Sequence, residues 1–230
     1  MARTGRAGAG QTAIRVPIAS QLLDGDLGMP ADPHGLVVFA HGSGSSRHSP
    51  RNQLVARALE RRDLATVLID LLTEQEGAID ERTAEFRFDI PLLASRLITI
   101  VEWLRHLSAA AALPIGLFGA STGGGASLIA AADRPGEIAA VVSRGGRPDL
   151  AGAALLRVIA PTLLIVGGRD SAVIQMNRDA IRQMRAEVKL EIVPGASHLF
   201  EEPGALARVA ALAGDWFTRY LPAVRSTRRG

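Results

Sequence analysis

The sequence predicts an α/β domain in which a mostly parallel β-sheet is covered by helices on both faces. Segments of strand type alternate with segments of helical period along most of the 230 residues. Several strand segments are continuous apolar runs, as expected where both faces of a strand are buried. No Pro/Ser-rich linker interrupts the interior. We expect a single domain over residues 13–221, a flexible tail at 1–12 and a basic tail at 222–230.

The strand segments occur in a regular order along the chain. They are Ile14–Ala19, Leu36–Ala40, Ala65–Asp70, Ile115–Gly119, Ile138–Ser143, Thr162–Val166 and Val188–Val193, with Leu22–Leu27 as an optional further strand.

Helices are expected between the strands. Pro50 suits the first turn of a helix whose apolar residues Leu54, Val55, Ala58 and Leu59 share one face. Asp89 is a candidate N-cap for a second helix, and a third runs from about residue 202 to 220 with Trp216 on its apolar stripe.

Composition and charge exclude several classes of protein. The chain has no cysteine, which excludes a disulfide scaffold, a thiolate nucleophile and thiolate zinc sites. It also lacks the apolar run of about 20 residues that a membrane span needs and the apolar stretch of a signal peptide, so the cytoplasm is the expected location.

The sequence pI of 10.4 does not indicate nucleic-acid binding. Five arginines lie in the two tails, and without them 21 basic residues face 23 acidic ones. Aromatic residues make up only 4% of the chain, so a basic groove lined with aromatics is not expected.

The motif Gly119-Ala120-Ser121-Thr122-Gly123 is the only Gly-x-Ser-x-Gly in the chain. It follows an apolar strand and precedes a helix-forming run, the setting of a serine on a sharp, strained turn above the carboxyl edge of a sheet. The alternative without a catalytic role is a glycine-rich turn that happens to contain a serine. The setting predicts Ser121 as a nucleophile.

A serine nucleophile needs a histidine base and an acid that orients it. His198 follows the last strand and Asp170 follows the Thr162–Val166 strand, so both should reach the same edge as Ser121. We predict them as base and acid. Alone, a loop histidine is usually solvated and such an aspartate is usually an N-cap. Asp149 is the reserve acid.

The loop His41-Gly42-Ser43-Gly44 follows the Leu36–Ala40 strand and could present backbone N–H groups to a developing oxyanion. We assign the amides of Ser43 and Thr122 as these donors. A plain Gly/Ser turn is the alternative. His41 is expected to pack or hydrogen-bond within its own loop, because one base suffices.

These motifs, in the order Ser121, Asp170, His198 with the His41 loop, resemble the α/β-hydrolase superfamily and, within it, the dienelactone-hydrolase-like proteins. The resemblance spans roughly residues 13–221. It implies an eight-stranded, mostly parallel sheet with a minimal lid, no cofactor, and hydrolysis of an ester or lactone through an acyl-enzyme. Dienelactone hydrolase proper has a cysteine where Ser121 stands, so the resemblance does not extend to its substrate.

Other motifs are weaker. The glycine clusters lack the third glycine of a dinucleotide-binding loop, and Lys189, the only lysine, is not preceded by P-loop glycines, so a nucleotide is not expected. No His-Glu-x-x-His motif occurs, so a metal is not expected either. Two loops should roof the site: Leu71–Asp89 and Arg144–Arg147. We expect Arg144 to pair with an acid of the facing loop, Glu85 among them, with a substrate carboxylate as the alternative partner.

The sequence thus predicts a serine hydrolase for a small carboxylic ester, lactone or thioester, with a small molecule as its partner, no nucleic acid, no membrane and the oligomeric state left open. An acyltransferase or perhydrolase would keep the same three residues. A binding protein on the same scaffold, without catalysis, is the rival from another class.

Overall fold

A computed structural model describes residues 10–222 of the chain. Eight strands occur in the described part: β1 (Gln11–Ile18), β2 (Gln21–Gly28), β3 (Gly35–Ala40), β4 (Leu64–Ile69), β5 (Ile115–Ala120), β6 (Ile138–Arg144), β7 (Thr162–Gly167) and β8 (Val188–Val193). The helices are α1 (Pro50–Glu60), α2 (Glu74–Thr83), α3 (Ile90–His106), α4 (Thr122–Asp133), the 3₁₀ segment η1 (Pro148–Arg157), α5 (Ser171–Ile181) and α6 (Ala205–Tyr220).

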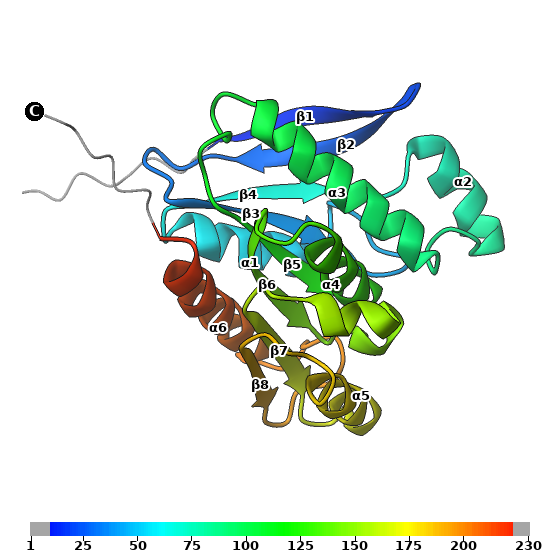
Figure 1. The fold of residues 1–230 in the computed structure, drawn as a ribbon, viewed down its shortest axis with the longest axis vertical. Coiled ribbons are helices and arrows are strands. Elements are labelled where there is room, and N and C mark those ends of the chain that lie inside the picture. Colours follow the sequence, from blue (N-terminus) through cyan, green and yellow to red (C-terminus); the bar gives the residue numbers. More distant parts are fainter. Residues whose placement is uncertain (1–9, 223–230) are drawn as a thin grey trace, which may run out of the picture.

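The strands form one sheet in the order β1-β2-β4-β3-β5-β6-β7-β8 (Figure 1). The six strands from β4 to β8 in this order are parallel, β2 pairs antiparallel with β4, and β1 pairs antiparallel with β2. Parallel strands bring their carboxyl ends to one edge of a sheet, so the loops that follow β3, β5, β6, β7 and β8 meet there. The mostly parallel sheet with helices on both faces is confirmed.

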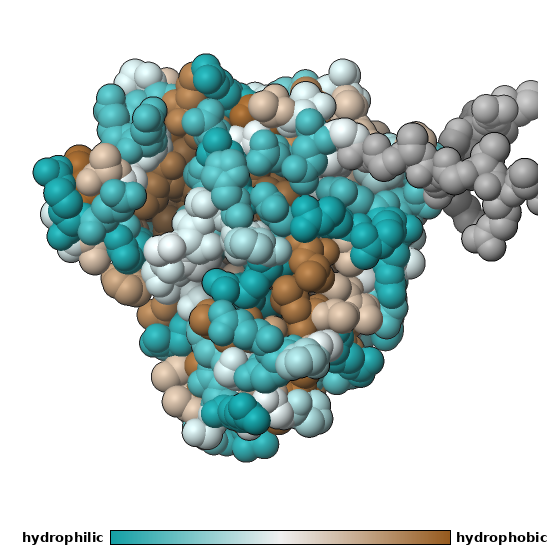
Figure 2. Space-filling model, turned by 180° about the vertical axis from the view of Figure 1, so that it is seen from behind, coloured by the Kyte–Doolittle hydropathy of each residue, from teal (hydrophilic) through white to brown (hydrophobic). Residues whose placement is uncertain are grey.

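Helices lie on both sides of the sheet (Figure 1), and an apolar layer fills the space between the sheet and the helices on each side. One layer joins the sheet to α3, α4 and η1, and the other joins it to α1 and α6. Strands β3, β4, β5 and β7 are buried at every position, which explains their continuous apolar sequences. The face that carries α1 and α6 is mostly hydrophilic outside, with small apolar patches (Figure 2).

Helix ends follow the capping signals of the sequence. Pro50 opens α1 behind the N-cap Ser49, and the Asp89 side chain accepts the Leu92 N–H at 3.0 Å at the start of α3. The predicted final helix is present as α6, with Trp216 on its buried face. Leu54, placed on the buried face of α1 by its spacing, is 39% exposed instead, and Asn52 and Ala56 are buried there.

The domain limits differ slightly from those expected. Strand β1 begins at Gln11, so the chain is already ordered two residues before the predicted start of the domain. Leu221, the last residue of the predicted domain, is fully buried. The rest of the two predicted tails lies outside the described residues, apart from Gly10 and Pro222.

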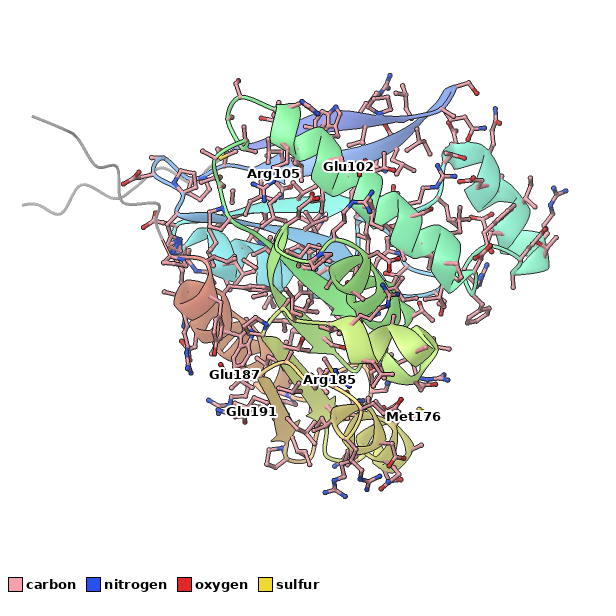
Figure 3. The ribbon with its side chains drawn as sticks, in the orientation of Figure 1. Glu102, Arg105, Met176, Arg185, Glu187 and Glu191 are labelled. Carbon is pink, nitrogen blue, oxygen red and sulfur yellow. The ribbon has the colours of Figure 1, made fainter. Side chains whose placement is uncertain are left out.

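Arginine side chains brace the side of the molecule opposite the site loops. Arg105, near the end of α3 (Figure 3), donates to the carbonyl oxygens of Leu113 at 2.8 Å and Glu137 at 3.1 Å. Glu102 on the same helix pairs with Arg134 at 2.6 Å. These contacts tie the turns that enter β5 and β6, and so fix the start of two strands whose far ends carry the site.

Candidate active site

Ser121 sits on a strained turn between β5 and α4. Its φ of 50° and ψ of −118° are unusual for a residue with a side chain, as the sequence predicted for this position. The turn is held by backbone hydrogen bonds from the Ser121 N–H to the Arg144 carbonyl at 3.2 Å and from the Arg147 N–H to the Ser121 carbonyl at 3.0 Å. These hydrogen bonds to the end of β6 and to the loop after it stabilise the strained conformation of Ser121.

Two glycines allow this turn to close. A Cβ on Gly119 would lie 2.5 Å from the Gly123 carbonyl oxygen, and a Cβ on Gly123 would lie 2.6 Å from the His41 carbonyl oxygen. Both positions therefore exclude any side chain. Because Gly123 is bare, helix α4 starts directly against the end of β3 and its loop.

The loops that carry Asp170 and His198 are tied to each other through their backbones. The Arg169 N–H donates to the Ala196 carbonyl at 2.9 Å, and the Gly168 N–H donates to the Val193 carbonyl at 2.9 Å. A Cβ on Gly167 would clash with the backbone of Ala196. The two loops are therefore held against each other by backbone contacts.

His198 and Asp170 form a direct hydrogen bond. His198 Nδ1 lies 2.6 Å from Asp170 Oδ2, and the other carboxylate oxygen accepts the Val173 N–H at 3.4 Å as the N-cap of α5. The aspartate thus both caps the helix and contacts the histidine. An Nδ1–H that donates to a carboxylate leaves Nε2 as the acceptor, which is the tautomer a general base needs.

Ser121 and His198 both lie against the residues at the end of β6. Gly145 follows Arg144, whose carbonyl binds the Ser121 N–H, and a Cβ on Gly145 would lie 3.4 Å from His198 Cε1. Within residues 10–222 no hydrogen bond joins the Ser121 hydroxyl to His198. The predicted triad residues therefore meet at one edge of the sheet, with the histidine–aspartate bond formed and the serine–histidine bond not formed.

A second acidic group fixes the loop of His198. Glu202 accepts the Ser197 N–H on both carboxylate oxygens, at 2.9 and 3.0 Å. This amide lowers the pKa of Glu202 below its ordinary value, so the carboxylate stays charged while it holds the loop. Phe200, with a φ of 57°, completes the turn. Sequence reasoning missed Glu202, and its place four residues after the histidine gave no signal.

The predicted oxyanion loop lies against the nucleophile. A Cβ on Gly42 would lie 3.1 Å from Ser121 Cβ, and the Ser43 N–H donates to Thr122 Oγ1 at 3.0 Å. Ser43 and Thr122, the two residues assigned as donors, are therefore in contact. The Ser43 N–H must exchange the Thr122 hydroxyl for an oxyanion before it can act as a donor.

His41 is buried and neutral in this loop. Its Nδ1 lies 3.0 Å from the Gly42 carbonyl oxygen and its Nε2 accepts the Leu71 N–H at 3.1 Å. Burial lowers the pKa of His41 below 6.5, outweighing the Gly42 carbonyl and Asp70, which would raise it. The Nδ1 contact lies within the loop, as predicted, whereas the Nε2 contact joins the loop to Leu71 after β4.

The segment Leu71–Asp89 contains helix α2, which projects from the body at the left of Figure 2. The sequence signal is a capping box in which Thr73 and Glu76 bind each other's backbone N–H groups. The segment is therefore not a loop throughout, as the sequence analysis predicts, but contains a helix. The helix and the oxyanion loop enclose a cavity of about 620 Å³.

Acids outnumber bases among the residues that line this cavity. Its ionisable residues are Asp24, Asp70, Glu74, Asp80 and Glu81 against Arg47 and Arg87, with His41 neutral. Both arginines are already paired, Arg47 with Asp70 and Arg87 with Asp80. The α2 side of the site is therefore unfavourable for an anion.

Arg144 does not pair with an acid, contrary to expectation. Within the described residues its side chain forms no ion pair, and its Nε and Nη1 are buried without a hydrogen-bond partner. Glu85 of the facing segment is exposed and does not reach it. The reason is the strand geometry: Arg144 is the last residue of β6 and is directed onto the layer beneath α1 and α6, not toward the Leu71–Asp89 segment.

The reserve acid Asp149 is also separated from the histidine. It binds the Arg147 guanidinium through two hydrogen bonds, of 2.9 and 2.7 Å, at the start of η1. Its partner is therefore the arginine two residues earlier, and Asp170 alone of the two acids contacts His198.

The sequence and the fold match those of known proteins. The alpha/beta hydrolase domain family matches residues 33–209, and the chain belongs to this family. Within it the chain is dienelactone-hydrolase-like: the crystal structure of a dienelactone hydrolase from Anabaena variabilis is 57% identical, with a TM-score of 0.92, covering 94% of this chain and 100% of that one. Fold and family are those of a hydrolase.

Two further matches are more limited. A Mycobacterium tuberculosis protein named "Putative phosphoribosyl transferase" is 56% identical over 206 residues, which is 90% of this chain but 44% of that protein. The chain thus spans less than half the length of this curated relative. Est1E from Butyrivibrio proteoclasticus shares the fold at 16% identity, with a TM-score of 0.73 and coverage of 90% and 98% of the two chains.

The described residues offer no group of three or more histidine, aspartate or glutamate side chains placed to hold a metal ion. Over the same residues, none of the helices combines the length and the apolar character that a membrane crossing needs.

Proposed function

We propose that this hydrolase cleaves a small carboxylic ester, lactone or thioester through an acyl-enzyme on Ser121. The observation that carries the proposal is the 2.6 Å hydrogen bond between His198 and Asp170, formed at the edge of the sheet where Ser121 stands on its strained turn. A hydroxyl becomes a useful nucleophile when such an oriented histidine can take its proton.

The reaction follows from the roles of the three residues. Ser121 Oγ attacks the carbonyl carbon while His198 Nε2 takes the hydroxyl proton, and the Asp170 carboxylate stabilises the resulting imidazolium. The tetrahedral oxyanion is held by the N–H groups of Ser43 and Thr122. The bond to the leaving alcohol or thiol then breaks, and His198 returns the proton to the leaving atom.

Water completes the cycle. His198 removes a proton from a water molecule, the hydroxide oxygen attacks the acyl carbon, and the bond to Ser121 Oγ breaks with the proton returned to the serine. The products are the carboxylic acid and free enzyme. No step needs a metal or an organic cofactor.

The name of the mycobacterial relative suggests phosphoribosyl transfer, which we do not assign to this chain. That name belongs to a protein of which the matched part is 44%. Gly-rich phosphate loops are absent from the sequence, and the three residues at the sheet edge suit acyl transfer to water.

The test is turnover of 4-nitrophenyl acetate and butyrate by wild type and Ser121→Ala. We expect the variant to lose activity by about 10³-fold or more, since a residual rate comes from binding and oxyanion donors alone. Ser95→Ala, an exposed serine on α3, is the matched control and should match wild type. Equal rates for Ser121→Ala and wild type would end the proposal.

Labelling separates the rival from another class. A fluorophosphonate probe should modify wild type at Ser121 and leave Ser121→Ala unmodified, whereas a binding protein without catalysis would resist labelling. Product analysis in the presence of alcohols or peroxide separates hydrolysis from acyl transfer to those acceptors.

A further inference from the structure

Thr122 places a buried hydroxyl directly beside the nucleophile. It is the first residue of α4, follows Ser121, and has only 4% of its surface exposed. Its Oγ1 accepts the N–H of Ser43 at 3.0 Å. A Cβ on Gly42, the residue before Ser43, would lie 3.1 Å from Ser121 Cβ. The bond between the threonine hydroxyl and the Ser43 amide therefore lies next to the reacting serine.

The hydrogen of this hydroxyl is unused. A threonine hydroxyl has one hydrogen to donate and two lone pairs with which to accept. Oγ1 accepts the Ser43 N–H, but no nitrogen or oxygen of residues 10–222 accepts its own hydrogen. Two other buried hydroxyls do donate: Thr162 Oγ1 to the Ala160 carbonyl at 2.9 Å, and Ser127 Oγ to the Gly123 carbonyl at 2.8 Å. Thr122 thus has a free donor at the site.

The backbone of Thr122 provides a second free donor. Its N–H is the first of α4, and the first N–H groups of a helix have no partner within the helix. Across the described part of the chain, no carbonyl oxygen accepts it. The same helix end carries the positive end of the helix dipole, which favours negative charge. One residue therefore offers an N–H and an O–H where negative charge develops when Ser121 attacks a carbonyl.

An oxyanion that accepts the Ser43 N–H must lie close to Thr122 Oγ1. Both oxygens take the same hydrogen, and an acceptor lies about 3 Å from the nitrogen that donates to it. Two such oxygens repel each other unless a hydrogen lies between them. The oxyanion has no hydrogen to donate, whereas the hydroxyl has one. Rotation about the Cβ–Oγ1 bond directs this hydrogen to the oxyanion without moving any heavy atom.

We propose that the side-chain hydroxyl of Thr122 is a third donor to the oxyanion, beside the backbone N–H groups of Ser43 and Thr122. The inference rests on the proposed function and adds a catalytic side chain to it. The hydroxyl keeps its proton, so the negative charge stays on the substrate oxygen until the leaving group departs. A hydrogen bond to a charged oxygen is about twice as strong as one between neutral groups. The hydroxyl therefore stabilises the transition state more than the bound ester and acts on kcat.

The first experiment removes the hydroxyl and keeps the shape of the side chain. In Thr122→Val we expect kcat for 4-nitrophenyl acetate to fall about 10²-fold or more, with KM within about threefold of wild type. Thr122→Ser keeps the hydroxyl and should stay within about tenfold of wild type in kcat. If Thr122→Val fails to fold, Thr122→Ser and Thr122→Ala decide the matter, because these two variants differ by a single oxygen atom.

A tetrahedral analogue tests the contact with the oxyanion itself. A trifluoromethyl ketone adds reversibly to a serine nucleophile and forms an oxyanion like that of the reaction. Its inhibition constant should rise in Thr122→Val by about the same factor by which kcat/KM falls, since both report binding of the tetrahedral state. Unchanged inhibition by the ketone in a folded Thr122→Val would contradict the inference.

The matched control is Thr162→Val, the same change at a buried threonine that begins β7, at the opposite edge of the sheet. It should lower the free energy of unfolding in urea and keep the wild-type kcat. An unchanged or higher kcat in Thr122→Val would overturn the inference, and a higher one would show that the hydroxyl only blocks the Ser43 N–H. Either result leaves Ser121-dependent turnover intact, whereas equal turnover in Ser121→Ala and wild type contradicts the proposed function itself.

Discussion

His198 Nδ1 lies 2.6 Å from Asp170 Oδ2, while Asp170 Oδ1 accepts the N–H of Val173 in the first turn of α5. One carboxylate thus holds both the histidine and a helix. The helix is in turn joined to the loop after β6, because the Asn177 side chain on α5 donates to the Gly146 carbonyl at 3.1 Å. The histidine is oriented by a group whose own position is fixed from two directions.

Asp170→Asn should separate these two tasks. Asparagine is as good an N-cap as aspartate, so the free energy of unfolding should change by less than about 1 kcal/mol. The charge that favours the required histidine tautomer is lost, and kcat should fall by on the order of 10⁴-fold. Ester hydrolysis and urea unfolding measure the two effects. Asp149→Asn, whose partner is Arg147, should keep wild-type activity. A rate for Asp170→Asn within tenfold of wild type would show that another acid serves His198.

Gly123→Ala should disrupt the contact between α4 and β3. A Cβ there would clash with the carbonyl oxygens of Ala40 and His41, which are backbone atoms that cannot rotate away. We expect a loss of about 3 kcal/mol or more in the free energy of unfolding, together with loss of activity. Urea unfolding provides the measurement.

Gly77→Ala is the matched glycine control. A Cβ on Gly77 would meet no atom within 4 Å, and the residue lies inside α2, so this change should add about 0.5–1 kcal/mol of stability. Equal free energies of unfolding for Gly123→Ala and Gly77→Ala would show that the close backbone contact at Gly123 does not require glycine.

Sequence reasoning located the strands and the three residues at their carboxyl ends because both depend on local pattern. Buried parallel strands are apolar runs, and the residue after such a run must lie at the sheet edge. Ser121 was predicted from its Gly-x-Ser-x-Gly motif, and Asp170 and His198 were predicted from their places in the loops after β7 and β8. Because all the parallel strands point the same way, the order of the strands alone predicts that these loop residues lie at the same edge of the sheet.

The features that were missed depend on contacts between distant segments. Helix α2 buries only Asp80 among its residues, so it has no apolar stripe to reveal it, and its capping box was the only signal. The unpaired state of Arg144 follows from which face of β6 it occupies and from where the acids of other loops end. The bond between the Ser43 amide and the Thr122 hydroxyl spans 79 residues and has no counterpart in local sequence.

His41 should make stability depend on pH. Burial holds its pKa below 6.5 in the folded protein, so the unfolded chain binds more protons as the pH falls below that value. The contribution of His41 to the free energy of unfolding should therefore be complete above about pH 6.5 and decrease as the pH falls below that value. Urea unfolding at about pH 5.5 and pH 7.5 should show a smaller difference for His41→Gln than for wild type. His106→Gln, an exposed histidine at the end of α3, should retain the wild-type difference.

Asp80 should hold the segment after α2 as a charged acceptor. Burial alone would raise its pKa, but hydrogen bonds from the amides of Arg87 and Phe86 and from the Arg87 guanidinium lower it below 3.8. The stabilisation is therefore present above pH 3.8 and lost as the pH falls through the lower folded value. Asp80→Asn should lose about 2 kcal/mol at neutral pH, and its difference from wild type should shrink in acid.

Hydrogen exchange localises the effect of this change. The Phe86 and Arg87 amides donate to Asp80 at 2.8 and 2.9 Å and should exchange faster in Asp80→Asn, whereas Glu85→Gln, at an exposed side chain of the same segment, should leave them protected. Because Asp80 and Arg87 line the same cavity as Gly42, Ser43 and Gly44, loosening this segment should alter that cavity, and kcat should fall with the lost protection. Unchanged exchange at both amides would mean that Asp80 does not hold the segment.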